Sequence, residues 1–312
     1  VSGGVRVIYE HLNRLRARGW HVEVYSLDKS RPGWFPLSPS IPWLKFENYD
    51  HLARHLSGRD AAKVATWWKT AAVVAEASGP GEGFYFVQDI ETHYYTAPMM
   101  KKSVMATYEL PLVQFTDSIY AEENLESCEF IGLGIDTGLF RSIDGVKRQV
   151  NAVLSLARAQ VLKGWSTHCE VYRKLYHTKQ FQLFSFGTTG LRPPYANPLP
   201  AGISDEELVS FYNRTGLFIS TSLHEGFSLT GLEAMACGAV VVCTNADGNM
   251  VYCEDDANCI VVPAGDAQAV VDACVSLVED SERMVKLQQG GFETAKRWPW
   301  EPVIDDLERI YG

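Results

Sequence analysis

Short apolar runs alternate with amphipathic stretches along the N-terminal half of the chain. Residues 5–18 carry apolar side chains three or four positions apart, which predicts a helix, and residues 21–25 alternate as a strand. A second helix is expected over 61–77 and a short buried strand over 84–87. Strands that alternate with helices in this way are typical of a parallel α/β sheet.

The C-terminal half repeats the alternation. Buried strands are expected over 150–156, 181–186, 217–220 and 239–243. Helices are expected over 205–212 and 229–237, and the chain closes on an amphipathic stretch. Ser204 and Glu207 form a capping-box pattern at the start of the helix over 205–212.

The length of the chain and one cluster of glycines indicate two domains. A chain of 312 residues is long for a single hydrophobic core. Gly132, Gly134 and Gly138 fall in one short span between the two alternating halves, which predicts a linker there. The chain opens on Val1 and runs directly into a helix, so we expect that the first strand of the N-terminal domain is missing.

The charge balance argues against two classes of partner. The net charge of −10 disfavours nucleic-acid binding, which normally needs a basic surface, and simple attachment to anionic lipid. No apolar run approaches the roughly 20 residues of a membrane span. We expect a cytoplasmic protein with at most peripheral contact at the inner face of the membrane.

The seven cysteines are scattered and form no CxxC pair, which is typical of reduced thiols in a cytosolic protein. We interpret them as small buried hydrophobic residues. The adjacent acids at 255–256 and at 305–306 lack further metal-ligand spacing, so we expect solvated surfaces there. We therefore expect no metal site at either pair of acids.

Two glutamates eight positions apart flank the start of the helix over 229–237. Glu225 falls in the preceding loop and Glu233 in the helix, so roughly two helical turns separate them. That separation disfavours direct cooperation as an acid–base pair. Because carboxylates accept hydrogen bonds from hydroxyls, we interpret them as two contacts to one polyhydroxylated ligand, such as a sugar nucleotide.

Two cations follow the strand over 150–156. Arg158 and Lys163 come just after its end, where ligands usually bind in an open α/β sheet. A departing diphosphate needs such cations, because negative charge grows on it as its bond breaks. The alternative is that both are solvated surface charges.

Each of two further groups of residues can be interpreted either as functional or as structural. Gly3 and Gly4 precede a helix whose N-terminal N–H groups can bind an anion, but any strand-to-helix turn uses glycine. Asp89, Glu91 and His93 follow the strand over 84–87, a position expected for catalytic groups. The acids there can instead cap the next helix.

Together these features resemble the retaining glycosyltransferases of family 4, also called glycosyl transferases group 1. That family has the GT-B architecture, an α/β fold of two Rossmann-like domains facing a cleft. The resemblance covers nearly the whole chain and rests on these elements: Gly3-Gly4, Gly134-Ile135-Asp136 with Phe140, Arg158 with Lys163, Glu225-x7-Glu233, residues 246–249 and the tryptophans before the last helix. Residues 86–91 further resemble bacterial rhamnosyltransferases that use dTDP-rhamnose.

The resemblance implies a domain division. Residues 1–145 would form the acceptor domain and residues 146–297 the nucleotide-sugar domain. The helix over 298–312 would cross back to the N-terminal domain.

The resemblance also implies roles for the candidate residues. Arg158 and Lys163 would hold the donor diphosphate, Glu233 the ribose hydroxyls, and Glu225 would lie against the donor sugar. Backbone N–H groups of Gly226, Phe227 and Ser228 would add donor contacts, as would Gly3 and Gly4. Asp89 is a further catalytic candidate, and Glu91 and His93 are acceptor-side candidates.

The implied activity is transfer of a hexosyl group, rhamnosyl in the narrower match, from a nucleoside-diphosphate sugar to a glycan or lipid-linked acceptor. The anomeric configuration would be retained, without cofactor or metal, in polysaccharide biosynthesis for the cell envelope. Two alternatives stay open: a sugar-nucleotide epimerase or phosphorylase on the same fold, and a non-catalytic GT-B-like binding module. Retention of both cations and both glutamates argues against the binding module.

Overall fold

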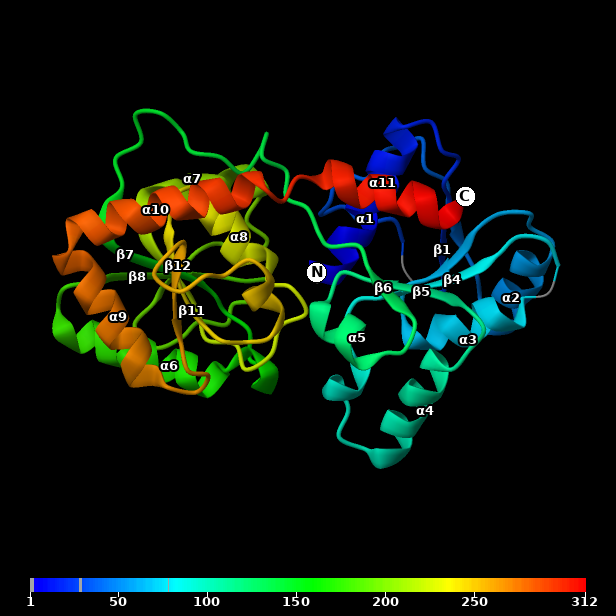
Figure 1. The fold of residues 1–312 in the computed structure, drawn as a ribbon, viewed down its shortest axis with the longest axis horizontal. Helices are drawn as coiled ribbons and strands as arrows, with labels where there is room; N and C mark the ends of the chain where they lie inside the picture. Colours follow the sequence, from blue (N-terminus) through cyan, green and yellow to red (C-terminus); the bar gives the residue numbers. More distant parts are fainter. Residues whose placement is uncertain (1–2, 28–29, 78) are drawn as a thin grey trace. The chain divides into compact units, whose positions relative to one another are not determined.

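The computed structural model describes residues 3–27, 30–77 and 79–312, and the chain divides into two compact units (Figure 1). Unit 1 comprises Val1–Leu133 and Glu301–Gly312, and unit 2 comprises Gly134–Trp300. The division falls at Leu133, inside the glycine-rich span that predicts a linker and ahead of the expected boundary at 145. The C-terminal residues belong to unit 1.

Unit 1 is built on a parallel four-stranded sheet of order β3-β4-β5-β6. Its strands are β3 (Lys63–Ala65), β4 (Gly83–Val87), β5 (Val113–Thr116) and β6 (Cys128–Phe130). A separate parallel pair consists of β1 (Val24–Ser26) and β2 (Trp43–Lys45). The helices of this unit are α1 (Gly3–Ala17), α2 (Tyr49–Ser57), α3 (Trp68–Glu76), η1 (Glu91–Tyr94), α4 (Pro98–Tyr108), α5 (Ile119–Asn124) and α11 (Trp300–Tyr311).

The C-terminal helix α11 is an integral part of unit 1. The Tyr311 ring packs against Phe84 and Phe115, which are fully buried on β4 and β5. At the helix surface, Glu308 accepts a hydrogen bond from the Arg18 guanidinium at 2.7 Å. The amphipathic pattern at the end of the chain therefore buries one face against the sheet of unit 1.

The helix expected over 61–77 is confirmed for residues 68–76 and is wrong before them. Residues Lys63–Ala65 form strand β3, which pairs in parallel with β4, and a helix begins only at Trp68. The alanine-rich sequence favours helix locally, but pairing with β4 overrides that preference because it forms the backbone ladder of β3 and buries Ala65. Two other expectations hold: a helix covers most of 5–18, and a strand covers 84–87, whereas the strand over 21–25 begins only at Val24.

Unit 2 contains a parallel six-stranded sheet of order β12-β11-β10-β7-β8-β9. Its strands are β7 (Gln149–Leu156), β8 (Gln182–Phe186), β9 (Asn197–Pro198), β10 (Thr215–Ser220), β11 (Val240–Thr244) and β12 (Cys259–Val262). The helices are η2 (Val161–Lys163), α6 (Trp165–Thr178), α7 (Asp205–Arg214), α8 (Leu229–Ala236), η3 (Gly248–Val251), α9 (Ala267–Glu279) and α10 (Ser281–Lys296). Counted in chain order the strands run 6-5-4-1-2-3, which is the Rossmann order read from the opposite edge.

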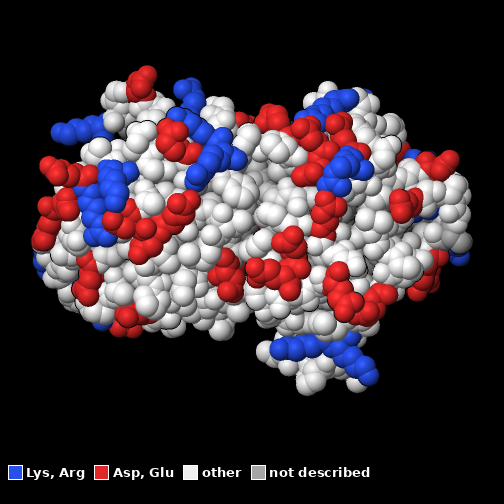
Figure 2. Space-filling model, viewed as in Figure 1, with Lys and Arg blue, Asp and Glu red and all other residues white. Residues whose placement is uncertain are grey.

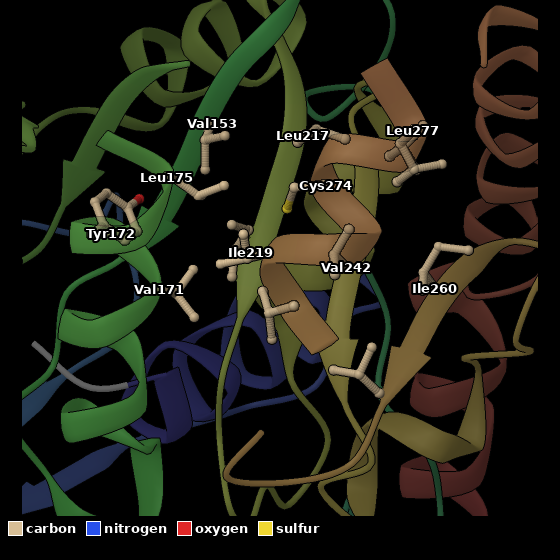
Figure 3. Close-up of a cluster of buried hydrophobic side chains, with 14 of the residues drawn as sticks. Val153, Val171, Tyr172, Leu175, Leu217, Ile219, Val242, Ile260, Cys274 and Leu277 are labelled. Atoms are coloured by element: carbon tan, nitrogen blue, oxygen red, sulfur yellow. The ribbon is translucent and has the colours of Figure 1, made fainter. Parts of the chain in front are cut away.

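The core of unit 2 lies between this sheet and two helices. Val153, Leu217 and Val242 project from the sheet toward Leu175 of α6 and Cys274 of α9 (Figure 3). The neighbouring residues on each strand are buried as well, so both faces of the sheet are covered. This accounts for the near-continuous apolar runs from which the strands were expected.

The expectations for unit 2 agree with the structure in most places. The strands expected over 150–156, 181–186, 217–220 and 239–243 are confirmed as β7, β8, β10 and β11. The helices over 205–212 and 229–237 are confirmed as α7 and α8. Both bonds of the capping box are present, since Glu207 N donates to Ser204 Oγ at 3.2 Å and Ser204 N donates to Glu207 Oε2 at 3.0 Å.

Most of the cysteines are buried, and charged side chains of both signs lie on the surface. All seven cysteines are free, and all but Cys169 are buried. On the face drawn in Figure 2, acidic side chains are widely spread and basic ones occur in small groups between them. Among the residues that the structure describes, no helix has the length and apolar character needed to cross a bilayer.

The close approach of β10 to β7 at Gly216 gives a test of the fold. A Cβ at this position would lie 2.2 Å from the Val150 carbonyl oxygen, so neither backbone can accommodate it without moving. We expect Gly216→Ala to lower the free energy of unfolding by about 1–3 kcal/mol, measured by urea denaturation. Gly190→Ala is the matched control, because nothing lies within 4 Å of its Cβ position. Equal stability of the two variants would contradict this packing.

Candidate functional site

The candidate site of unit 2 forms where two adjacent parallel strands end. β7 and β10 are neighbours, yet the chain leaves β7 for β8 on one side and reaches β10 on the other. In open α/β sheets, ligands bind outside the carboxyl ends of the strands at such a switch point. Arg158 follows β7 closely, and Glu225 lies in the loop that joins β10 to α8.

A close backbone contact docks the segment after β7 onto the loop after β10. Gly164 has a left-handed φ of 61°, and a Cβ there would lie 1.9 Å from the Thr221 carbonyl oxygen. Leu223 N also donates a hydrogen bond to the Leu162 carbonyl oxygen at 2.7 Å. Only glycine allows this approach. As a result η2, which ends in Lys163, lies against the loop that carries Glu225.

Lys163 and Glu225 form a half-buried ion pair. The ammonium nitrogen of Lys163 lies 2.8 Å from Glu225 Oε2, and the two side chains are 18% and 16% exposed. The Ser222 hydroxyl donates to the other carboxylate oxygen, Oε1, at 2.6 Å. Glu225 is therefore held at both oxygens, so its carboxylate is fixed in position at the edge of the sheet.

Arg158 differs from Lys163 in its surroundings. Its side chain is half-buried. Within the part of the chain that the structure describes, no side-chain or backbone acceptor hydrogen bonds to its guanidinium. A half-buried guanidinium that lacks a protein acceptor can take an anionic ligand, since burying such a charge without a partner is unfavourable.

The loop before α8 ends in a residue with a strained backbone conformation. Ser228 has a φ of 77°, a left-handed conformation that is uncommon for a residue with a side chain. Tyr252 stabilises it by donating its hydroxyl to the Ser228 carbonyl oxygen at 2.7 Å. Phe227 is buried against the rings of Tyr252 and Trp298, with centroids 5.4 and 5.1 Å away.

The backbone N–H groups of this loop are available. Among the described residues, no protein acceptor hydrogen bonds to the N–H of Gly226, Phe227 or Ser228. They precede α8, whose N-terminus carries the positive end of the helix dipole. Such a cluster of N–H groups can bind an anion.

Glu233 differs from Glu225 in its hydrogen-bond partner and in its burial. It is only 5% exposed within α8, and the Tyr212 hydroxyl lies 3.4 Å from its Oε2. The two glutamates thus have separate hydrogen-bond partners, Ser222 and Lys163 for one and Tyr212 for the other. Their separate surroundings suit two different contacts better than one acid–base pair.

The remaining candidates belong to unit 1. Gly3 and Gly4 form the first turn of α1, and the Gly4 carbonyl accepts a hydrogen bond from the Gln88 amide at 2.7 Å. A Cβ on Gly4 would lie 2.4 Å from Gln88 Oε1, so glycine permits this contact with the end of β4. Asp89 is 5% exposed and accepts hydrogen bonds from Ile90 N at 2.8 Å and the Tyr94 hydroxyl at 2.6 Å.

Glu91 and His93 both lie in η1, the short helix after β4. One carboxylate oxygen of Glu91 accepts from Trp68 N at 3.0 Å and from the Tyr85 hydroxyl at 3.1 Å. Because Trp68 is the first residue of α3, Glu91 caps that helix, and not the next one along the chain. Burial raises the pKa of Glu91 to about 7.

The sequence interpretation missed several residues of these two regions. Asp117 follows β5 as Asp89 follows the neighbouring β4, and both are 5% exposed. Burial, with a smaller contribution from the Asp89 charge, raises the pKa of Asp117 well above its ordinary value. The sequence signal is an acid directly after the short alternating run over 113–116. In unit 2, the His224–Asp247 pair, 2.8 Å apart, joins the loops after β10 and β11 and has no local sequence signal.

The raised pKa of Glu91 predicts how stability depends on pH. The native state binds this proton more tightly than the unfolded chain, whose glutamate pKa is about 4.3. The stabilisation is therefore present below pH 4.3 and is lost as pH rises to about 7. In the wild type, the free energy of unfolding should therefore fall between pH 4.5 and pH 8. We expect that fall to be smaller by roughly 2–3 kcal/mol in Glu91→Gln, measured by urea denaturation.

Glu126→Gln, which changes an exposed glutamate of the same unit, is the control for this experiment. Its pH dependence should match that of the wild type. The assignment fails if both variants keep the wild-type slope.

Residues 199–294 match the family model described as Glycosyl transferases group 1. The D-inositol 3-phosphate glycosyltransferase of Saccharomonospora viridis is 32% identical over 106 residues, which are 34% of this chain and 25% of the relative. The MMP alpha-(1->4)-mannosyltransferase of Mycolicibacterium hassiacum is 28% identical over 205 residues, 60% of this chain and 48% of the relative. The matched part of this chain thus spans about a quarter to a half of these curated relatives.

Solved structures resemble the whole chain. Sucrose-phosphate synthase from Thermosynechococcus elongatus superposes with a TM-score of 0.83 at 16% identity, covering 100% of this chain and 93% of that one. HepE of Anabaena, solved with UDP and glucose, gives a TM-score of 0.81 at 15% identity, covering 99% and 95%. The chain therefore has the GT-B fold, and the matched segment supports a group 1 glycosyltransferase.

Proposed function

We propose that the protein transfers a hexosyl group from a nucleoside-diphosphate sugar to a hydroxyl acceptor. The observation that carries the proposal lies at the ends of β7 and β10. The Arg158 guanidinium follows β7 and has no protein acceptor among the residues that the structure describes, and the Lys163–Glu225 ion pair joins the segments after the two strands. Glu225 also falls inside the segment that matches the family model. Cations, N–H groups and carboxylates together suit a ligand with an anionic diphosphate and a hydroxyl-rich sugar.

These groups suit the charges that would develop during the reaction. Glycosyl transfer passes through an oxocarbenium-like state while negative charge develops on the departing diphosphate. Arg158, Lys163 and the N–H groups of Gly226, Phe227 and Ser228 would stabilise that charge. Preorganisation matters here, because donors already in place need no rearrangement as the bond breaks.

The carboxylates would hold the two sugars of the donor. Glu225 would accept hydrogen bonds from hydroxyls of the transferred sugar while Lys163 turns toward phosphate. Glu233 would accept from the ribose hydroxyls. In unit 1, the first turn of α1 at Gly3 and Gly4 would add N–H contacts to the donor.

The acceptor would bind to unit 1, where we place Asp89 as a catalytic group and Glu91 and His93 as acceptor contacts. The acceptor would be a glycan or a lipid-linked sugar, and a lipid-linked one would place the reaction at the inner face of the cytoplasmic membrane. Such a step belongs to polysaccharide biosynthesis for the cell envelope.

We further propose that the reaction retains the anomeric configuration without a metal or cofactor, as in family 4. Proton NMR of the first product tests the stereochemistry, since the coupling of the anomeric proton distinguishes retention from inversion. A product of inverted configuration would contradict this part of the proposal. Transfer that persists in EDTA supports independence of divalent metals, and loss of transfer restored by Mg²⁺ would overturn it.

The donor is the least defined component. HepE was solved with UDP-glucose, a relative is named a mannosyltransferase, and residues 86–91 resemble enzymes that use dTDP-rhamnose. We propose a hexosyl donor with rhamnose as the specific candidate. A thermal-shift panel of UDP-glucose, GDP-mannose and dTDP-rhamnose identifies it, because the bound donor raises the apparent Tm.

Removal of either member of the ion pair should impair transfer. We expect Lys163→Ala and Glu225→Gln each to lower kcat/KM by at least about a hundredfold, as for loss of a transition-state contact. Lys174→Ala is the matched control, because Lys174 also pairs with a glutamate, Glu170, but on α6 and with a side chain that is 36% exposed. Near-normal rates for both site variants would refute their assignment.

Loss of Arg158 should weaken binding of the diphosphate itself. A charge-assisted hydrogen bond contributes about 1.5–3 kcal/mol, so Arg158→Ala should raise the Kd for the nucleoside diphosphate roughly ten- to a hundredfold. Arg173→Ala, at an exposed position of α6, is the control in the same titration. An unchanged Kd for Arg158→Ala would exclude it from the diphosphate site.

The same assays separate the alternative functions. An epimerase would convert the donor sugar without any acceptor, and a phosphorylase would need inorganic phosphate. A binding module would bind its ligand with no turnover under any condition. Turnover that depends on the acceptor supports the transferase.

A further inference from the structure

Three cysteines of unit 2 converge beneath the loop after β11. Cys243 lies on β11, Cys253 follows η3, and Cys259 begins β12. All three are buried, at 3% exposure or less, and their sulfur atoms lie within 4.8 Å of one another. The Sγ atoms of Cys243 and Cys253 are 3.6 Å apart.

This arrangement differs from that of ordinary buried cysteines. A buried thiol usually acts as a small hydrophobic group, as Cys274 does within the core beside α9. Here three chain segments each direct a sulfur to one point. Soft thiolates that converge in this way select Zn²⁺ or Cu⁺ over hard cations.

The spacing of the sulfurs suits one metal ion. Zinc–sulfur bonds are about 2.3 Å, so two thiolates on a tetrahedral zinc ion lie about 3.8 Å apart. The Cys243–Cys253 separation is close to that value. The carbonyl oxygen of Glu254 lies 3.8 Å from Cys259 Sγ, which puts an oxygen donor beside the cluster.

We propose that Cys243, Cys253 and Cys259 form a structural binding site for a thiophilic metal ion, with Zn²⁺ as the occupant. The thiols release their protons when the ion binds. Affinity for zinc therefore rises with pH.

The ligands bracket a segment that supports the loop before α8. Within this segment, Gly248 N donates to the Glu225 carbonyl oxygen at 3.0 Å. Tyr252, next to Cys253, donates to the Ser228 carbonyl oxygen at 2.7 Å. An ion that joins β11, β12 and Cys253 fixes the backbone from which both contacts are made.

Zinc titration of the reduced, metal-free protein tests the site directly. Calorimetry and native mass spectrometry should show one Zn²⁺ per chain, with an affinity that increases from pH 6 to pH 8. Hydrogen exchange over residues 244–259 should slow when zinc is bound. No readout uses glycosyl transfer, so the result is independent of the proposed function.

Cysteine variants assign the ion to these residues. Cys243→Ser, Cys253→Ser and Cys259→Ser should each weaken zinc binding at least about tenfold, whereas Cys274→Ser, at a buried cysteine outside the cluster, should bind as the wild type does. Zinc binding that survives all three substitutions would overturn the assignment. So would a wild-type protein that binds no zinc, a result that needs no variant to fold.

The oxidation state of the cysteines in the purified protein provides a further test of the proposed metal site. A mass lower by two hydrogens in protein purified without reductant, together with failure of the reduced protein to bind zinc, would show a disulfide-forming pair and contradict the proposal. A bound ion in the purified protein, released only by a chelator, supports it.

Discussion

The parallel pairing of β7 with β10 is the constraint on which the candidate site of unit 2 depends. These strands are distant in sequence, yet their pairing brings the residues that follow each of them to one edge of the sheet. Gly216 allows the two backbones to approach, and Gly164 allows the segment after β7 to rest on Thr221. Both contacts bring the segment that carries Lys163 beside the loop that carries Glu225, where the two side chains form an ion pair.

The two cations at this edge of the sheet differ in their partners, and the difference affects how an anionic ligand would bind. Lys163 already has a carboxylate partner, whereas Arg158 has none among the residues described. A ligand with a diphosphate would therefore meet one available cation and one that must be shared with Glu225. The exchange would keep the ammonium paired with an anion, while sugar hydroxyls would replace it as donors to Glu225. The same exchange would free the Glu225 carboxylate for sugar hydroxyls.

Local sequence signals identified β7, β8, β10 and β11 because both faces of the sheet are covered there, so each of these strands is largely apolar. The sequence did not predict β9 or β12. The first part of the helix expected over 61–77 is wrong because local preference for helix in an alanine-rich segment competes with pairing to β4, which depends on residues farther along the chain. The same limit applies to the sites. Arg158, Lys163 and Glu225 follow recognisable strands, but the His224–Asp247 pair and the cluster of Cys243, Cys253 and Cys259 arise only when β10, β11 and β12 are placed side by side.

The central claim is that the carboxyl edge of β7 and β10 binds the diphosphate of a sugar nucleotide. A crystal structure of the protein grown with uridine diphosphate tests it most directly. The account predicts phosphate oxygens within hydrogen-bond distance of the Arg158 guanidinium and the Lys163 ammonium, with the Lys163–Glu225 contact lengthened from 2.8 Å. A diphosphate bound elsewhere on the chain, with Lys163 and Glu225 still paired and no phosphate at Arg158, would contradict it.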